Sequence, residues 1–211
     1  MRSVLPVLDA AGIERAAARL AALDPMLREL VGRHGTPPSW FRDPGFATLV
    51  LLILEQQVSL ASAAAAYGRL EAELEVVEPA GFNRLSDARL RAVGFSRQKA
   101  GYARSLASAI ESGRVSLEDM ALLSDDDVRI RLLALRGVGP WTAECYLLFA
   151  LRRSDAWPSG DRALLISLGA ARGDRETPTA ATAEALGERW RPWRSVAARI
   201  LWHAYLSDRA R

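Results

Sequence analysis

The most constraining feature of this 211-residue sequence is a helical hydrophobic period, about 3.6 residues long, that recurs from one end to the other. No stretch alternates apolar and polar residues for long enough to predict a β-strand. Half of the residues are apolar and 25% are charged, so the chain can bury a core and most of it is not predicted to be disordered. We therefore expect an all-α protein, with enough length for one large domain or two small lobes.

Capping residues divide the chain into separate helices. Asp43-Pro44 is expected to start an apolar helix that runs through Gln57, because Asp caps the first amides and Pro is tolerated at the first helical position. Further helices are predicted after caps at Asp24, Ser59, Ser86, Ser96 and Ser124, and over residues 140–152, 161–171, 180–190 and 193–208.

Charge and cysteine content restrict the class of protein. The 28 basic residues exceed the 25 acidic ones to give a net charge of +3, and Lys99 is the only lysine, so almost all positive charge is on arginine, which suits contacts with phosphate. The single cysteine, Cys145, excludes a disulfide framework, a cysteine-based zinc site and a four-cysteine iron–sulfur cluster. The longest apolar stretch, residues 46–54, is too short to cross a bilayer, and no signal peptide is evident. We expect no membrane partner and a cytoplasmic location.

The densest local signal is a glycine-containing turn between two helices, with the sequence LRGVGPWTA over residues 135–143. A helix is expected to end at Gly137 and another to begin near Pro140, so that both Gly137 and Gly139 can adopt unusual dihedral angles. Backbone amides at the start of the second helix can bind phosphate. An ordinary helix–helix turn is the alternative interpretation of the Gly-x-Gly pattern.

Further along, Asp161 follows the Gly/Pro-containing segment WPSG and precedes an apolar helical pattern. A helix N-terminus favours an ionised carboxylate at this position. Taken singly, such an Asp is most often only a helix cap. The order of hairpin, helix, Gly/Pro loop and Asp makes a chemical role more plausible than any of these features alone.

Three separated segments together resemble one family: residues 53–59 (ILEQQVS), the hairpin with Asp161, and residues 189–195 (RWRPWRS) with Trp202. They resemble the helix-hairpin-helix, Gly/Pro-rich-loop, Asp superfamily of DNA base-excision glycosylases, and within it are most similar to the bacterial 3-methyladenine DNA glycosylase II. The resemblance implies a monomer with two helical lobes, residues 1–40 plus 155–211 and residues 41–154, and an active site in the cleft between them. It also implies that the family's N-terminal β-rich domain is missing here.

The resemblance further implies a base-excision repair enzyme that flips a damaged nucleotide out of double-stranded DNA and hydrolyses its N-glycosidic bond. Asp161 matches the catalytic Asp, which would stabilise the positively charged sugar and orient or deprotonate water. The base pocket would include Trp141, Trp202, Gln56 and Cys145. Cys145 stands where the closest relatives have a Tyr, so the range of damaged bases is left open.

The same resemblance assigns the DNA contacts. These are Gly137, Val138, Gly139 and Thr142 in the hairpin, together with Ser96 and Arg97. Arg97 is the best match to the residue that fills the gap left by the flipped base, and a solvated Arg after a helix cap is the alternative. The carbonyls of Leu133, Leu135 and Val138 would hold a monovalent cation that bridges to phosphate, and no other cofactor is expected.

The lack of a lysine in the hairpin distinguishes two kinds of glycosylase. Family members that also cleave the backbone have a lysine at the position of Trp141, and Lys99 lies in another segment. We therefore expect a monofunctional enzyme that uses water on alkylated purines of the 3-methyladenine and 7-methylguanine type. Two alternatives are kept: a glycosylase for deaminated or oxidised bases, and a non-catalytic helix-hairpin-helix DNA-binding protein.

Several other polar residues are expected to have minor roles. Glu55 is expected to be exposed, with a pocket acid as the alternative. His34 and His203 are interpreted as surface or core residues rather than metal ligands. A mixed solvated face around Trp193 is expected for Arg191, Arg194 and Arg199.

Overall fold

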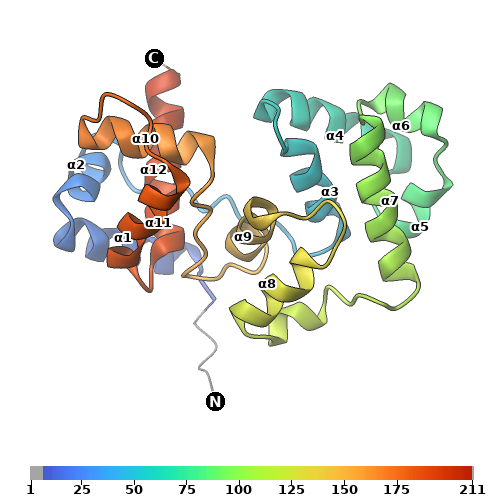
Figure 1. Cartoon of the computed structure of the whole chain (residues 1–211), viewed down its shortest axis with the longest axis horizontal. Coiled ribbons are helices and arrows are strands. Elements are labelled where there is room, and N and C mark those ends of the chain that lie inside the picture. The colour runs from blue at the N-terminus through green and yellow to red at the C-terminus, as the bar shows by residue number, and fades with distance from the viewer. Residues whose placement is uncertain (1–6, 211) are drawn as a thin grey trace. The chain divides into compact units, whose positions relative to one another are not determined.

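The structure is a computed structural model that describes residues 7–210, and it contains helices and no strand over that range (Figure 1). The prediction of an all-α protein is therefore confirmed. The described residues form two compact units, one made of residues 7–41 and 147–210 and the other of Arg42–Tyr146. The sequence had suggested a division near residue 154. Within residues 7–210, no helix has the length and apolar character that crossing a membrane requires.

The first unit is built around its last helix, α12 (Arg194–Arg209), which packs against α1 (Ala10–Leu23), α2 (Pro25–His34) and α10 (Arg162–Arg172) (Figure 1). The remaining elements of this unit are α11 (Ala180–Gly187) and a short 3-10 helix, Glu188–Trp190. Because α12 contacts three helices, ten of its residues, from Arg194 to Ala204, are buried.

Two buried arginines on α12 correct the expectation of a solvated face. Arg199 is completely buried, and Arg194 is 5% exposed. The Arg194 guanidinium contacts both carboxylate oxygens of Asp155, at 2.9 and 3.0 Å. Arg199 donates to the carbonyls of Ser39, Leu148 and Ser195, at 2.9, 2.9 and 3.1 Å. Burial of a charge is tolerated only with such partners, so these arginines order the unit's interior instead of facing solvent.

The two histidines lie close together in the first unit. The rings of His34 and His203 are 6.4 Å apart, and the Trp40 ring stands edge-on to His203 at 6.3 Å. The His34 side chain is 2% exposed and its Nε2 lies 3.7 Å from Asp208 Oδ1. Burial and the neighbouring His34 hold the pKa of His203 below its ordinary value, while a hydrogen bond to the Gly35 backbone opposes this shift.

The second unit has α3 (Phe46–Glu55) at its centre, packed against α4 (Leu60–Leu74) and α7 (Arg97–Glu111). Its other elements are α5 (Pro79–Arg84), α6 (Asp87–Val93), a 3-10 helix (Asp119–Leu122), α8 (Asp125–Leu133) and the start of α9 (Pro140–Phe149). Most of α3 is buried, as its apolar sequence predicts.

The predicted N-terminal caps are confirmed at five helices and wrong at one. The caps whose side chains accept a hydrogen bond from their own helix are Asp24, Ser59, Ser86, Ser96 and Ser124. Asp43-Pro44 does not start α3. That helix begins at Phe46, after Gly45 with φ +142°, and the Asp43 carbonyl instead accepts from Thr48 Oγ1 at 2.6 Å. Nor does α3 reach Gln57. It ends at Glu55, because Gln56 has a non-helical ψ of 123°, and Gln57 follows with a left-handed φ of +59°.

We expect His203 to make unfolding of the protein sensitive to pH. Its pKa is lowered in the folded state, so the unfolded chain takes up a proton near pH 6.5 while the folded protein does not. Stability is then fully present above that pH and decreases as the pH falls toward the folded-state pKa. Urea unfolding between pH 7.5 and 5.5 should show a shallower decrease for His203→Gln than for the wild type. Equal slopes would contradict this assignment.

Candidate functional site

Asp161 is fixed by donors from two helices of the first unit. It caps α10, where its Oδ1 atom accepts a hydrogen bond from the Leu164 amide at 2.8 Å. The same oxygen accepts from the indole nitrogen of Trp202 on α12, also at 2.8 Å. The Asp161 residue is half-buried, so the structure combines a defined carboxylate orientation with access to its surface.

The loop before Asp161 is anchored by a buried aromatic side chain. Trp157 is 3% exposed, its ring stands edge-on to Trp190 at 5.4 Å, and its indole nitrogen donates to the Ala183 carbonyl at 3.1 Å. The Asp161 amide in turn donates to the Pro158 carbonyl at 2.9 Å. These contacts make the Gly/Pro loop a tight, well-held connection, which is the form that a precisely placed carboxylate requires.

Trp202, which the sequence predicted to line a base pocket, also holds Asp161 in place. One face of its ring stacks on Phe149, with centroids 5.3 Å apart and ring planes at 19°. Only 8% of the residue is exposed. Its hydrogen bond to Asp161 therefore makes Trp202 a residue that orients the carboxylate, with a small surface left for another contact.

The predicted hairpin between α8 and α9 is present in the second unit. Gly137 has a φ of +87°, and a Cβ at this position would lie 2.2 Å from Cγ of Tyr102 on α7. Gly137 is thus required both by its backbone conformation and by its contact with a ring. Gly139 has no positive φ, and a Cβ there would meet nothing within 4 Å. The expectation of unusual dihedral angles holds for Gly137 only.

Gln56, at the end of α3, holds the hairpin from the inside. Its Nε2 donates to the Gly137 carbonyl at 2.9 Å and to Thr142 Oγ1 at 3.0 Å. Thr142 is 1% exposed, so its hydroxyl contacts Gln56 inside the protein. The sequence had predicted a contact of Thr142 with DNA. Gln56 was expected in a base pocket, whereas its amide here joins α3 to both sides of the turn.

Two further parts of the hairpin are the buried Val138 and the backbone amides at the start of α9. The Val138 side chain is 5% exposed, and its amide donates to the Leu135 carbonyl at 3.1 Å. We therefore expect an anion at the hairpin to be bound mainly by backbone amides in the first turn of α9. Pro140 is the first residue of α9, as predicted.

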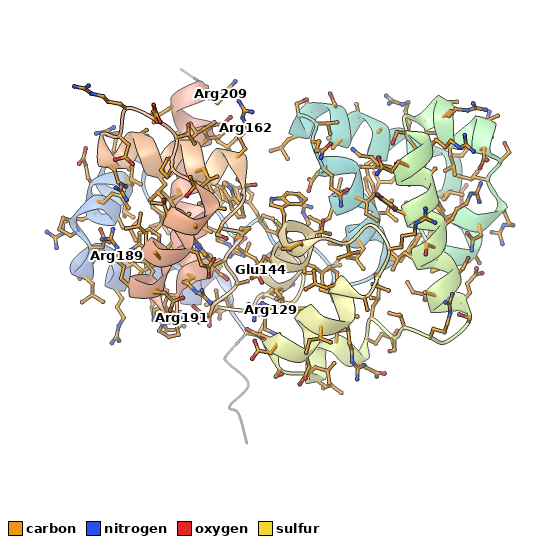
Figure 2. All side chains as sticks on the ribbon, in the orientation of Figure 1. Arg129, Glu144, Arg162, Arg189, Arg191 and Arg209 are labelled. Carbon is orange, nitrogen blue, oxygen red and sulfur yellow. The ribbon has the colours of Figure 1, made fainter. Side chains whose placement is uncertain are left out.

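An ion pair connects the two helices of the hairpin. Arg129 on α8 and Glu144 on α9 lie side by side (Figure 2), with Nε to Oε1 at 2.5 Å and Nη2 to Oε2 at 3.2 Å. Glu144 is 15% exposed in its side chain, so water weakens this pair less than an exposed one.

The start of α7 lies beside the end of α3. Ser96 caps α7 by accepting from the Lys99 amide at 3.2 Å, and Arg97 is exposed at the first helical position. The Nζ atom of Lys99 donates to the carbonyls of Leu54 and Gln56, both at 2.7 Å. These contacts of Lys99 could not be predicted from the sequence, since no local pattern reveals a partner that is distant in sequence.

Trp141 and Cys145 are one helical turn apart on α9 and so share a face of the helix. Trp141 is half-buried. Cys145 is completely buried and offers no surface to a ligand in this structure. Of these two predicted pocket residues, only Trp141 has accessible surface.

Glu55 is not exposed, contrary to expectation. Its carboxylate forms two hydrogen bonds with the Arg42 guanidinium, at 2.7 and 2.9 Å, and its side chain is 8% exposed. A two-point contact of this kind holds the carboxylate in place. Gln57, two residues after Glu55, is exposed and has a φ of +59°. This left-handed conformation is uncommon outside glycine and was not predicted from the sequence.

The sequence of the chain is similar to those of known DNA repair proteins. The sequence profile described as "HhH-GPD superfamily base excision DNA repair protein" matches residues 50–192. A DNA-3-methyladenine glycosylase of Bacillus subtilis is 30% identical over 119 residues, which are 56% of this chain and 39% of that protein. The chain thus spans about two fifths of the length of the curated Bacillus relatives that it matches.

Among the similar solved structures, two 3-methyladenine glycosylases match most of the chain. The Schizosaccharomyces pombe 3-methyladenine DNA glycosylase in complex with abasic DNA has a TM-score of 0.84 and 27% identity, covering 89% of this chain and 95% of that one. A DNA-3-methyladenine glycosidase from Bacillus halodurans has a TM-score of 0.75 and 30% identity, covering 92% and 91%.

The two hairpin glycines should respond differently to substitution. Gly137→Ala should lower the free energy of unfolding by roughly 2–4 kcal/mol, because the new methyl group overlaps Tyr102 and the φ angle disfavours a side chain. Gly139→Ala should change it by less than about 1 kcal/mol. Urea unfolding of both variants tests this difference.

Gly139 also allows the expected DNA contact of the hairpin to be tested without disturbing the fold. Gly139→Leu should keep its stability and weaken binding to damaged and intact duplexes alike, because the side chain covers the first amides of α9. Fluorescence anisotropy at several salt concentrations measures this effect. Unchanged binding would remove the hairpin from the DNA interface.

Proposed function

Because the chain belongs to the HhH-GPD superfamily of base excision DNA repair proteins, we propose that it is a DNA glycosylase that removes alkylated purines from double-stranded DNA. The reaction is hydrolysis of the N-glycosidic bond, of the 3-methyladenine DNA glycosylase II type. The substrates named for its relatives in Schizosaccharomyces pombe and Bacillus support this choice.

The observation that carries the proposal is the fixed carboxylate of Asp161. Its Oδ1 is held by Leu164 and Trp202, so the negative charge has a set position before any substrate binds. Breaking the bond between base and sugar builds positive charge on the sugar. A charge that is already oriented stabilises that state without a cost of reorganisation.

In the proposed mechanism, the damaged nucleotide leaves the base stack and its sugar approaches Asp161. The bond from C1′ to the purine nitrogen breaks, and its electron pair leaves with the base. Water then adds to C1′ and gives its proton to the carboxylate. An alkylated purine carries a formal positive charge and departs as a neutral molecule, so no general acid is needed.

Aromatic surface would recognise the base. We assign this role to Trp141, which is half-buried, and to the small exposed part of Trp202. An electron-poor, cationic base binds well to indole rings. Cys145 would act from beneath this surface by leaving more space than the Tyr of similar enzymes, which we expect to alter the set of bases accepted.

Binding of the DNA backbone is assigned to the hairpin and its neighbours in the second unit. The amides at Gly139 and in the first turn of α9 would contact phosphate, and Ser96 and Arg97 at the start of α7 would lie against the same strand. Arg97 is exposed and can enter the gap left by the flipped base, and the exposed Gln57 is a second candidate for this position.

A monovalent cation is part of the proposal. The carbonyl oxygens of Leu133, Leu135 and Val138 would hold it, as the resemblance implies, and neutral oxygen donors suit an alkali ion. The Leu135 carbonyl already accepts one hydrogen bond, from the Val138 amide, which leaves its second lone pair for an ion. When bound, the ion would supply positive charge next to a phosphate.

Asp161→Asn tests the chemistry while keeping the cap, since Asn also accepts the two hydrogen bonds. Loss of an attraction of about 4 kcal/mol between charges about 4 Å apart should slow base release roughly a thousandfold. Release of free base from methylated duplex DNA under single-turnover conditions measures the rate. Asp9→Asn, at the cap of α1 in the same unit, is the matched control and should retain full activity.

The same assay distinguishes the alternatives. If wild type and Asp161→Asn both bind methylated DNA and neither releases a base, the protein is a non-catalytic DNA-binding module. Duplexes with single lesions should show slow release of neutral bases such as 8-oxoguanine, because no general acid assists their departure. Faster release of a neutral base than of a methylated purine would favour an enzyme for oxidised or deaminated bases.

We also propose that the enzyme has no lyase activity. A lyase needs an amine that attacks C1′, and the only lysine, Lys99, has its Nζ bonded to two carbonyls of α3. Borohydride reduction in the presence of abasic-site DNA should therefore trap no covalent complex. A trapped complex that disappears in Lys99→Arg would identify a bifunctional enzyme.

A further inference from the structure

We propose that Lys99 is a positioning residue whose ammonium group joins the start of α7 to the end of α3 and thereby sets the position of the hairpin through Gln56. This inference rests on the proposed function, in which the hairpin binds DNA. It assigns to the only lysine a role in DNA binding that involves no contact with DNA.

The contacts of Lys99 are short and directed at one helix end. Its Nζ donates to the Leu54 and Gln56 carbonyls, each at 2.7 Å. Carbonyls in the last turn of a helix have no partner within that helix and carry the negative end of its dipole. A cation placed there satisfies two of them at once. Lys99 is half-buried, and burial lowers the pKa of its ammonium group.

Gln56 transmits this contact to the hairpin. Its backbone carbonyl is held by Lys99, and its side-chain amide donates to the Gly137 carbonyl and to Thr142 Oγ1. The direction of the Gln56 side chain depends on the backbone of the same residue, which is the C-cap of α3. A shift of this carbonyl would therefore move the amide away from one or both hairpin acceptors.

A second residue of α7, Tyr102, also contacts the hairpin. The Tyr102 ring lies directly against Gly137, and its hydroxyl accepts from Gln98 at 2.6 Å. Lys99 is therefore on the helix that supports the hairpin through Tyr102 and contacts the residue that supports it through an amide. Ser96 and Arg97, the other assigned DNA contacts, precede Lys99 by one turn or less. One ammonium group thus connects all the DNA-binding elements assigned to the second unit.

The chain offers a matched control on the same helix. Arg104 of α7 also donates to backbone carbonyls, those of Asn83 at 3.2 Å and Leu85 at 2.5 Å, at the end of α5. It therefore makes the same kind of contact with a different helix, and none of these partners belongs to the hairpin. Arg104 also pairs with Asp87, at 3.0 Å, so Arg104→Met removes an ion pair in addition to two carbonyl contacts. Both variants thus remove two carbonyl contacts of a cation on α7, with different expected consequences for the hairpin.

We expect Lys99→Met to bind duplex DNA roughly tenfold more weakly, because contacts of a charged donor are lost at the support of the hairpin. Base release at saturating DNA should change less than about threefold, since the partners of Asp161 described above belong to the first unit. Arg104→Met should keep the wild-type affinity. Lys99→Arg, which can still donate to carbonyls, should recover most of the affinity.

Hydrogen exchange provides a readout that is independent of DNA. In the free protein, the amides of Gly137, Val138, Gly139, Trp141 and Thr142 should exchange at least roughly tenfold faster in Lys99→Met than in Arg104→Met. If Lys99→Met does not fold, Lys99→Gln, which keeps a donor on a shorter side chain, takes its place. Equal effects of the Lys99 and Arg104 variants on exchange and affinity would overturn the inference. Failure of the wild type to bind DNA, with the exchange difference intact, would instead overturn the proposed function.

Discussion

The hydrogen bonds of a single oxygen, Oδ1 of Asp161, are the constraint on which the proposed chemistry depends. One bond closes the first turn of α10, and the other comes from an indole on α12, the helix around which the first unit is built. A capping interaction contributes about 1 kcal/mol to stability, so the cap alone would tolerate several residue types. The charge is what only Asp or Glu provides. Asp161 is thus both the cap of α10 and the group whose negative charge the proposed reaction requires.

The hairpin depends on a different kind of constraint, which is the close approach of its backbone to neighbouring groups. Gly137 has no room for a side chain against Tyr102, and its carbonyl is taken by Gln56. The Arg129–Glu144 pair joins the two flanking helices. These contacts fix the backbone of the turn, and the proposed binding of phosphate by the amides at the start of α9 depends on that fixed conformation.

Most helices were predictable because their signals are local. A Ser or Asp cap such as Ser96 or Asp24 lies within three residues of the amide that it binds, so the pattern is complete in the sequence. Asp43-Pro44 failed as a start signal because Thr48 and Gly45 offered the backbone another arrangement. The end of α3 was also predicted wrongly, because Gln56 leaves the helical conformation with ψ 123° and its side chain bonds instead to groups distant in sequence.

Residue roles that depend on distant partners were not predictable in this way. Glu55 and Arg199 have sequence surroundings that fit solvent exposure, yet each is buried by groups far along the chain. The resemblance to a family indicated Asp161 and the hairpin, because it carries information about distant residues that local patterns lack. It could not indicate the bonds of Lys99 or the burial of Cys145, which depend on how this particular chain packs.

The proposed chemistry and the proposed DNA binding consequently depend on separate groups of contacts. The described partners of Asp161 belong to the first unit, and those of Gly137, Gln56 and Lys99 belong to the second. Sites without shared contacts usually contribute additively to free energy, so a change in the hairpin should alter the affinity for DNA without altering the charge proposed to stabilise the sugar. The proposed recognition of the base is the exception, because Trp202 is assigned part of the aromatic surface and also orients Asp161. Substitutions at Trp202 should therefore change the selection of the base and the rate of its release together, which substitutions at Trp141 need not do.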